Sequence, residues 1–469
     1  MTQGGTIHSK SVTGGKPEDP RRAVARSRAN AREPYFFVSM IAAGLVLLAS
    51  AWVSSGTMAP YAATLDPTFV RVQPPCDYLT NVDQPHFEAA FRMLQGKPRS
   101  LWEGSVMLRR ILYFILAFPL MSAWGFDVGG FVTNLILMLA ASLAWVIFVR
   151  RVIGEQAAMV SMWLLATYPG IAYWVGLPYS YVWIVPGSLL FGMLLWKLAT
   201  VRRQLSTVLL SLGMGFLSWG YDLLPFFGTA AVLILVRRRR FGELATAILG
   251  MGIAMGILIL GLNLIFHVPL RNSNTEPYWI ILASFTKPID YAGWWKLVAS
   301  LPAVFLNNFA FSNFLFLPLL FVALAAISLI GERSIRLETP EAEILLAVLI
   351  VFLFNNLAPP YPGWQMRGSW IARLYQPVFV AFLLFVSRSV QRWWNRSRAG
   401  YLGRISAALV AVTVVANAAV VWGPLLGLPF ASEIYHQFYR HGSAANLQLN
   451  LERHGRRPLG ICESGRSSR

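Results

Sequence analysis

The sequence predicts an all-α polytopic membrane protein with about eleven transmembrane helices. The chain has 469 residues, of which 56% are hydrophobic and only 13% are charged. Its mean hydropathy is +0.53, and several apolar runs reach the roughly 18–20 residues that cross the hydrocarbon core of a bilayer. Lysines and arginines lie in short clusters between these runs. Together these observations exclude a soluble globular protein.

The basic clusters predict the orientation of the chain in the membrane. The net charge is +19, but clusters between apolar runs are typical of cytoplasmic loops rather than of a nucleic-acid-binding surface. We therefore expect the N-terminus inside and no nucleic-acid partner. The clusters are Arg21, Arg22, Arg26, Arg28 and Arg32; Arg150 and Arg151; Lys197, Arg202 and Arg203; Arg237 to Arg240; Arg333 and Arg336; and Arg388, Arg392, Arg396 and Arg398.

A basic tail precedes the predicted membrane domain. Residues 1–34 are rich in Gly, Ser and Arg and contain no apolar signal-peptide core, which predicts a disordered cytoplasmic tail. The membrane domain covers residues 35–423, and residues 424–469 form an extracytoplasmic tail. With every basic cluster inside, the predicted spans lie near 36–55, 128–149, 157–175, 181–199, 206–220, 222–236, 243–266, 314–331, 343–357, 374–391 and 404–423.

Two apolar segments allow more than one interpretation. The segment 106–124 is apolar enough to be a further span, but counting it would move Arg150 and Arg151 to the outer face. We therefore expect an interfacial or re-entrant helix there. The segment 206–236 could be one bent helix. The sequence Trp219-Gly220-Tyr221-Asp222 at its middle instead favours a hairpin tip at the outer surface, where Asp222 reaches water.

Three loops hold the remaining polar residues on the predicted outer side. They cover residues 56–127, 267–313 and 358–373, and the second has tryptophans among charged residues, as an interfacial helix would. The chain has two cysteines, Cys76 and Cys462, which both fall outside the cytoplasm. A disulfide and two free thiols are both open there, while a zinc site built from cysteine alone is excluded.

The first loop gathers the residues that suit chemistry best. Asp77, Asp83 and Glu88 lie close together in sequence, beside His86. A carboxylate near the membrane surface can act as the general base on an acceptor hydroxyl. The alternative is that these acids only solvate the loop, and Asp83 would also suit the N-cap of a helix from about Gln84 to Gln95. A divalent metal on the acids and His86 stays open, but no second histidine at helical spacing supports one, so no metal site is assigned.

The order of residues in this loop resembles the first luminal loop of GT-C glycosyltransferases, which use polyprenyl-phosphate sugars. The shared pattern is carried by Asp83-Gln84, Phe87, Ala90 and Gly96. The loop is also similar to that of the family 22 dolichyl-phosphate-mannose mannosyltransferases, through Cys76-Asp77, Asn81, Pro85-His86, Gly96, Trp102-Glu103 and Arg109-Arg110. It departs from family 22 at Tyr78, where a second acid would stand, and its Pro-His spacing is one residue short.

The resemblance continues beyond the loop. The stretch from Arg150-Arg151 through Gly154 to Ala157-Ala158 is similar to a basic-Gly-Ala junction of the superfamily. The following span ends at Tyr168-Pro169, and Arg373-Leu374-Tyr375-Gln376-Pro377 is similar to the opening of a late helix in related enzymes. The resemblance covers residues 36–390, in the order of residue types more than in identity.

The resemblance implies an integral membrane, multi-pass glycosyltransferase of the cell envelope with a GT-C-like fold. Such an enzyme transfers a hexose or pentose, mannose in family 22, from a polyprenyl-phosphate donor to a hydroxyl of a glycan, lipid or protein acceptor. The lipid-phosphate sugar is the donor substrate, no cofactor is assigned, and a divalent metal stays open. The active site would lie on the extracytoplasmic side of the plasma or bacterial inner membrane. Asp77 or Asp83 would be the catalytic base, with Asp77 narrowly favoured. The expected substrate-binding residues are His86, Trp102, Glu103, Arg109, Arg110, Asp222, Arg367 and Arg373.

Physical chemistry supports these assignments and also offers simpler ones. Arginine binds phosphate oxygens in a bidentate manner and stays charged at the membrane surface. Stabilising the phosphate leaving group can replace a strong general acid, and a direct in-line attack would invert the sugar carbon. An arginine at a helix end can equally extend to the interface without any ligand. Asp222 is the one acid near the middle of an apolar stretch, which makes it a functional candidate by position.

Other functional classes fit the sequence less well. A membrane transporter or lipid-linked-sugar flippase would carry ionisable residues or Gly/Pro breaks in midplane helices, whereas the charges here lie in outer loops. A ligase or polymerase of surface polysaccharide would have its largest outer loop late in the chain. A non-catalytic assembly subunit stays open because Tyr78 replaces the second acid.

Overall fold

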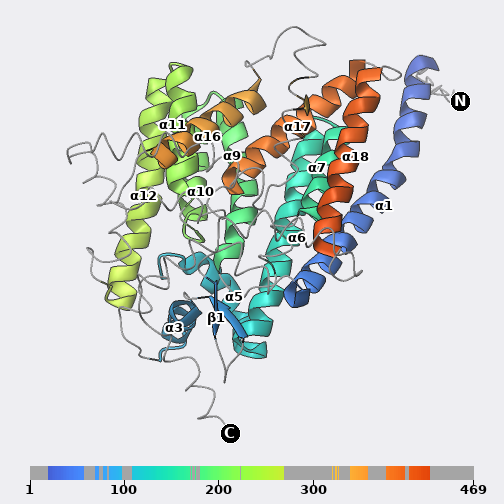
Figure 1. Ribbon diagram of the computed structural model, residues 1–469. Helices are drawn as coiled ribbons and strands as arrows, with labels where there is room; N and C mark the ends of the chain where they lie inside the picture. Colours follow the sequence, from blue (N-terminus) through green and yellow to red (C-terminus); the bar gives the residue numbers. More distant parts are fainter. Residues whose placement is uncertain are drawn as a thin grey trace, which may run out of the picture.

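The protein is a bundle of helices with one small β-hairpin at one end (Figure 1). The computed structural model describes residues 20–57, 69–72, 78–81, 84–97, 108–168, 180–221, 223–268, 339–357, 376–396 and 401–422, with isolated positions at 171, 175, 320, 323, 324 and 326. The helices are α1 (Pro20–Thr57), α3 (Gln84–Leu94), α5 (Ile111–Trp124), α6 (Phe126–Val152), α7 (Glu155–Thr167), the 3-10 helix η1 (Ser180–Trp183), α9 (Ile184–Thr200), α10 (Gln204–Leu217), α11 (Leu224–Arg237), α12 (Phe241–Phe266), α16 (Pro340–Leu357), α17 (Gln376–Arg396) and α18 (Tyr401–Trp422).

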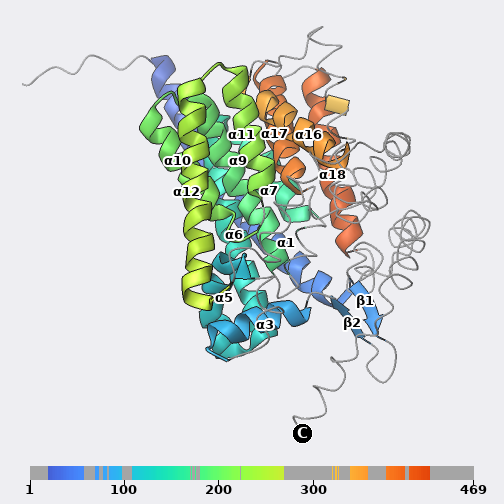
Figure 2. The same ribbon diagram turned by 90° about the vertical axis from the view of Figure 1, so that its left-hand side faces the viewer.

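The hairpin corrects the all-α expectation. Strands β1 (Phe69–Val72) and β2 (Tyr78–Asn81) pair antiparallel, with Phe69 opposite Asn81 and Val72 opposite Tyr78. Phe69, Val70 and Val72 in β1 and Tyr78 and Thr80 in β2 are aromatic or β-branched, and these residue types favour extended backbone. In both views the hairpin lies at the same end of the bundle as α3 and α5 (Figures 1 and 2). The first loop therefore contains folded structure on either side of residues 73–77.

Three described helices are long and apolar enough to cross a membrane. They are Pro34–Trp52, Val128–Val152 and Phe241–Phe266, and they coincide with the spans predicted at 36–55, 128–149 and 243–266. Shorter apolar helices accompany them at Ile111–Trp124, Ile184–Thr200, Gln204–Leu217, Phe227–Arg237 and Gly403–Ala419. The chain is thus an integral membrane protein, while the count of eleven spans and their orientation remain predictions.

Helix α1 begins earlier than the sequence interpretation placed it. The tail over residues 1–34 was expected to be disordered, but the helix starts at Pro20. This expectation was wrong for the described part of the tail because Ala and Arg, which dominate residues 21–33, are strong helix formers. Proline also suits the first position of a helix, where its missing N–H costs no hydrogen bond. Residues 1–19 lie outside the described residues.

Helix α7 ends earlier than predicted, and the 206–236 segment forms two helices. Helix α7 covers the span expected over 157–175 only to Thr167, and two described positions beyond it, Ile171 and Val175, are again helical. Tyr168 has extended backbone angles, φ −67° and ψ 118°, because a residue that precedes proline, here Pro169, avoids the helical region. Between α10 and α11 the chain turns at residues 218–221. This turn confirms that the segment forms two helices and not one bent helix. The span predicted at 314–331 falls almost entirely outside the described residues.

Helix α5 is too short to cross the bilayer by itself. It has 14 residues, which corresponds to a length of about 21 Å against a hydrocarbon thickness of about 30 Å. Its length therefore fits the interfacial or re-entrant position predicted for the 106–124 segment. The buried Tyr113 hydroxyl donates a hydrogen bond of 2.9 Å to Oδ1 of Asn134 in α6. This bond holds the first turn of α5 against the first half of α6.

The helix ends that carry the described basic clusters lie at the end of the bundle opposite the hairpin, uppermost in Figure 1. Side-chain contacts connect several of these clusters. The Arg150 guanidinium carbon lies 4.4 Å from the centre of the Phe36 ring in α1. Arg238 and Arg240, in the turn between α11 and α12, bind carbonyl oxygens at the end of α9. We call this end of the molecule the basic end.

An arginine–glutamate pair joins the end of α11 to α9 and α16 at the basic end. Arg238 donates from Nε to both carboxylate oxygens of Glu343 in α16, at 2.9 and 3.1 Å, and its Nη1 donates to the Ala199 carbonyl. The Glu343 side chain is only 6% exposed and that of Arg238 is 24% exposed. The carboxylate and the helix-end carbonyl, which are buried within the protein, thus both have hydrogen-bond donors.

Arg240 caps the same helix end from a neighbouring position. Its guanidinium donates to the carbonyl oxygens of Leu198 at 2.8 Å and Val201 at 2.6 Å, and it also pairs with Glu243 in α12. The Thr207 hydroxyl of α10 donates to the same carboxylate at 2.8 Å. Positive charge at a helix C-terminus is favoured by the helix dipole. The two arginines therefore tie α9, α10, α12 and α16 together.

Gly154 allows α17 to reach the first turn of α7. Oε1 of Gln391 in α17 accepts a hydrogen bond of 3.0 Å from the backbone N–H of Ala157. A Cβ at Gly154 would lie 2.6 Å from that oxygen, and the glycine has φ +144°. Only glycine adopts this angle easily. The glycine of the basic-Gly-Ala junction thus serves a contact between helices that are far apart in sequence.

We expect removal of either partner of the Arg238–Glu343 pair to destabilise the bundle, because the remaining buried group loses its partner. Glu343→Ala and Arg238→Ala should each lower the Tm of the detergent-solubilised protein, and the double variant should lose less than the sum. The coupling free energy in this double-mutant cycle should be about 1–3 kcal/mol. Arg203→Ala removes an exposed arginine and should leave the Tm unchanged. Strictly additive losses would contradict the interaction.

Candidate functional site

Most of the predicted site residues lie outside the described part of the chain. Arg109 and Arg110 are described with their side chains, and His86 is described as a backbone position in the first turn of α3. The cysteines Cys76 and Cys462 also lie outside, so their pairing stays open. The predicted site residues outside the described ranges are Asp77, Asp83, Trp102, Glu103, Asp222, Arg367 and Arg373.

Helix α3 packs one face on α5 and α6. It confirms the helix predicted from about Gln84 to Gln95. Phe87 and Phe91 are buried and lie one helical turn apart, so they share a face. The Phe87 ring centre is 6.1 Å from that of Phe114, and the Phe91 ring is 5.9 Å from both Phe118 and Phe126. These contacts fasten the first loop to the end of the bundle (Figure 2).

The position of α3 orients the neighbouring loop segments. His86 stands in its first turn, and Asp83 directly precedes its first residue in the sequence. The opposite face of the helix is polar, with Arg92 exposed and Glu88 partly exposed. An amphipathic helix of this kind suits the boundary between hydrocarbon and water. The acids of the first loop are therefore attached, through the chain, to an element anchored at this end of the bundle.

Arg110 is a buried cation at the end of the bundle that carries α3. Its residue is 4% exposed, and its guanidinium carbon lies 4.2 Å from the centre of the buried Tyr221 ring. A desolvated cation over an aromatic ring is stabilised by about 2 kcal/mol. Guanidinium groups stay protonated in proteins, so Arg110 places a permanent positive charge here. Arg109 is partly buried beside it.

The turn between α10 and α11 supports this arginine. The Leu112 N–H donates to the Trp219 carbonyl at 3.0 Å, which joins the start of α5 to the turn. Tyr221 belongs to the same turn and is the sequence neighbour of Asp222. The structure therefore brings together two segments that the sequence analysis selected separately, residues 109–110 and residues 219–222. Asp222 itself lies outside the described residues.

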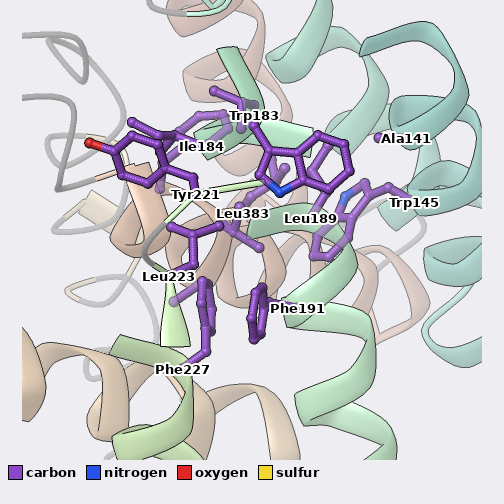
Figure 3. Close-up of a cluster of buried hydrophobic side chains, with 14 of the residues drawn as sticks. Ala141, Trp145, Trp183, Ile184, Leu189, Phe191, Tyr221, Leu223, Phe227 and Leu383 are labelled. Atoms are coloured by element: carbon purple, nitrogen blue, oxygen red, sulfur yellow. The ribbon is translucent and has the colours of Figure 1, made fainter. Parts of the chain in front are cut away.

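Trp183 packs beneath the turn and holds its shape. Its indole N–H donates to the Leu217 carbonyl at 2.9 Å, and the indole ring occupies the space that a side chain at Gly220 would need. Figure 3 shows Trp183 and Tyr221 in one apolar cluster, with the Tyr221 hydroxyl directed away from Phe191 and Phe227. The two phenylalanine rings stack at 4.8 Å and 10°. The turn therefore packs against a cluster of buried aromatic side chains.

Several residues of this region were missed in the sequence analysis. Tyr113 and Trp183 belong to no motif and look like ordinary apolar residues, and Tyr221 was selected only as part of the turn from Trp219 to Asp222. Asn134 had a usable signal, since it is an amide within an apolar span. Its Nδ2 donates to the Val175 carbonyl at 3.2 Å, while its Oδ1 accepts from Tyr113. The buried Asn134 therefore links α5, α6 and the segment that follows α7.

The described residues contain no group of three histidine, cysteine, aspartate or glutamate side chains that could hold a metal ion. The side chains that were considered for a divalent metal, those of Asp77, Asp83 and His86, lie outside that part of the chain. A divalent metal at the first loop therefore stays a prediction. What this end of the bundle does offer is a permanent cation, Arg110, next to an anchored amphipathic helix. This combination suits an anionic group at the membrane surface.

Comparison with known proteins yields one structural similarity. No family model matches the chain, and no curated protein matches it significantly. Its structure is similar to the crystal structure of ArnT from Cupriavidus metallidurans bound to undecaprenyl phosphate, with a TM-score of 0.47 and 13% sequence identity. The similarity covers 88% of this chain and 77% of that chain. At this sequence identity and TM-score, the function has to be inferred from the residues of the chain itself.

We expect Gly220→Ala to disturb the turn that supports Arg110, because the added methyl group would overlap the Trp183 ring. Overpacking of this kind costs about 1–3 kcal/mol, so the Tm in detergent should fall by several degrees. Gly213→Ala is the matched control, since its Cβ would meet only Leu194 at an ordinary 3.4 Å. Equal Tm values for both variants would show that Trp183 does not require glycine at residue 220.

Proposed function

We propose that the chain is a GT-C-type glycosyltransferase that moves a sugar from a polyprenyl-phosphate donor to a hydroxyl acceptor. The observation that carries the proposal is the buried Arg110, which lies next to the anchored first loop whose residues resemble those of the superfamily. A lipid-phosphate donor holds its isoprenoid in the bilayer and its phosphate at the interface. A permanent cation at the end of an apolar bundle suits such a phosphate.

The proposed reaction takes place on the extracytoplasmic face. Basic residues flank spans on the cytoplasmic side, and the clusters around Arg150 and Arg238 lie at one end of the bundle (Figure 1). Helix α6, which has 27 residues, separates that end from α3 and Arg110. This arrangement supports the orientation inferred from the sequence, in which the first loop faces outward.

In the proposed mechanism, a carboxylate of the first loop activates the acceptor. Asp77 or Asp83 takes the proton of the acceptor hydroxyl, and the hydroxyl oxygen attacks the anomeric carbon of the sugar. The bond between that carbon and the phosphate oxygen breaks on the opposite side, which inverts the configuration. The polyprenyl phosphate leaves with the bonding electron pair, and the cations Arg109 and Arg110 stabilise its negative charge.

The remaining predicted residues are proposed to bind the substrates. The aromatic and acidic side chains suit sugar hydroxyls, and the arginines of the third outer loop suit the donor phosphate. The similarity to family 22 favours a hexose such as mannose, and we assign the reaction no cofactor beyond the lipid-linked donor. These residues are His86, Trp102, Glu103, Asp222, Arg367 and Arg373.

We expect Asp77→Asn to lower sugar transfer by about 100-fold or more, since an amide cannot accept the proton. Asp83→Asn tests the alternative base in the same way. Glu88→Gln changes a third acid of the same loop to which no role is assigned and should retain activity. Each variant would be returned to a deletion strain, and its lipid-linked glycans and surface polysaccharides compared with wild type. Full activity of both aspartate variants, at normal membrane levels, would overturn the proposed mechanism.

We expect Arg110→Lys to weaken the donor interaction although it keeps the positive charge. Lysine lacks the planar fork that binds phosphate and stacks on Tyr221, so kcat/KM for the donor should fall about tenfold or more. Arg92→Lys changes an exposed arginine of α3 and should leave the rate unchanged. The assay follows transfer by purified protein from a polyprenyl-phosphate sugar. Translocation of that lipid without any transfer would instead favour the transporter or flippase function.

A further inference from the structure

An apolar groove lies between α1, α6 and α7, far from Arg110. It has a volume of about 190 Å³, and its lining includes Met40, Gly44 and Leu47 from α1 and Ser142 and Val146 from α6. Apart from the neighbouring backbone of α1 itself, no atom of the described residues lies within 4 Å of the position that a Cβ at Gly44 would occupy. The two helices therefore leave a gap between them where glycine stands.

The groove lies at the depth of the lipid hydrocarbon. Its α1 residues fall inside the apolar span Pro34–Trp52, and its α6 residues fall inside Val128–Val152. The residues from Met40 to Leu47 cover about 10 Å along the helix axis. Apart from the Ser142 hydroxyl the lining side chains are apolar. Apolar space at this depth favours a hydrocarbon chain over water.

A cation stands in line with the groove toward the basic end. Arg150 follows Val146 by one turn of α6, and its guanidinium carbon lies 4.4 Å from the centre of the Phe36 ring. Phe36 in turn precedes Met40 by one turn of α1. The arginine is therefore about 6 Å along the axis from the last groove residues. Arginine at this level binds the phosphate of an anionic lipid head group.

We propose that this groove binds one anionic phospholipid from the leaflet at the basic end. One acyl chain lies along α1 and α6 past Gly44, and the head-group phosphate pairs with Arg150. The lipid fills the gap between α1 and α6 and holds α1 against the bundle. The site is separate from the proposed transfer reaction, because the donor phosphate would lie at the opposite end of α6, near Arg110.

The first experiment measures lipid retention by the purified full-length protein. Native mass spectrometry with added dioleoyl phosphatidylglycerol or phosphatidylcholine should show one tightly held phosphatidylglycerol on the wild type, together with a raised Tm. Gly44→Leu places a side chain in the groove and should weaken this binding by more than about tenfold. Gly252→Leu on α12 is the matched control, since it also has nothing within 4 Å but lies outside the groove, and it should bind like the wild type.

The second experiment separates the head group from the chain. Arg150→Gln should reduce the preference for phosphatidylglycerol over phosphatidylcholine by about fivefold, while Arg150→Lys should keep most of it. Arg203→Gln, an exposed cation at the same end, should change nothing. Equal retention by wild type and Gly44→Leu, or equal affinity of the wild type for both lipids, would overturn the proposal. Selective retention of a polyprenyl phosphate in the groove, lost in Gly44→Leu, would also overturn it.

Discussion

The bundle depends on one constraint, which is that polar groups inside hydrocarbon must find their partners within the protein. Tryptophan provides many of these partners, because its large ring packs in an apolar interior while its N–H can reach a neighbouring helix. Among the described helices, three indole N–H groups donate to serine hydroxyls on other helices. These pairs are Trp145–Ser161 at 2.6 Å, Trp163–Ser39 at 3.0 Å and Trp422–Ser50 at 3.1 Å. They connect α6 with α7, and α1 with both α7 and α18.

Helix ends raise the same constraint in a sharper form, since their last carbonyl groups have no partner within the helix. The last carbonyl groups of α9 accept hydrogen bonds from two arginines in the connection between α11 and α12. Glu343 and Glu243 pair with these two arginines in turn. The N-terminus of α7 solves it with Gln391 of α17. Both solutions bring together elements that are distant in sequence. The arginines of the basic end therefore cap helix ends, in addition to indicating the orientation of the chain in the membrane.

The opposite end uses its cation differently. Arg110 lies over the Tyr221 ring, and the neighbouring elements are an amphipathic helix and a turn. The turn that carries Tyr221 packs against buried aromatic side chains, which include Trp183 and the stacked pair Phe191 and Phe227. A cation whose side chain is already held in place by packing can bind an anion without a prior change of conformation. The two ends of the bundle thus divide structural and proposed chemical roles between them.

The sequence alone determined those features that depend on local composition. Apolar length located the spans at 36–55, 128–149 and 243–266, because crossing hydrocarbon is a requirement on a continuous segment. Asp83 as an N-cap candidate, followed two residues later by Pro85, located α3, and the sequence Trp219-Gly220-Tyr221-Asp222 located the break between α10 and α11. The start of α1 and the end of α7 also have local causes, in the Ala/Arg composition after Pro20 and in Pro169, which hydropathy does not report.

Only the tertiary structure decided which distant residues meet. The contact of Arg110 with Tyr221, the pairing of Arg238 with Glu343 and the approach of Gln391 to Gly154 each join segments from separate helices. The sequence marked Arg110 and the 219–222 turn as separate candidates, and their contact was not foreseeable from either. The physical reason is that hydropathy and helix propensity act along the chain, whereas a partner for a buried charge or an uncapped helix end is set by how the helices pack.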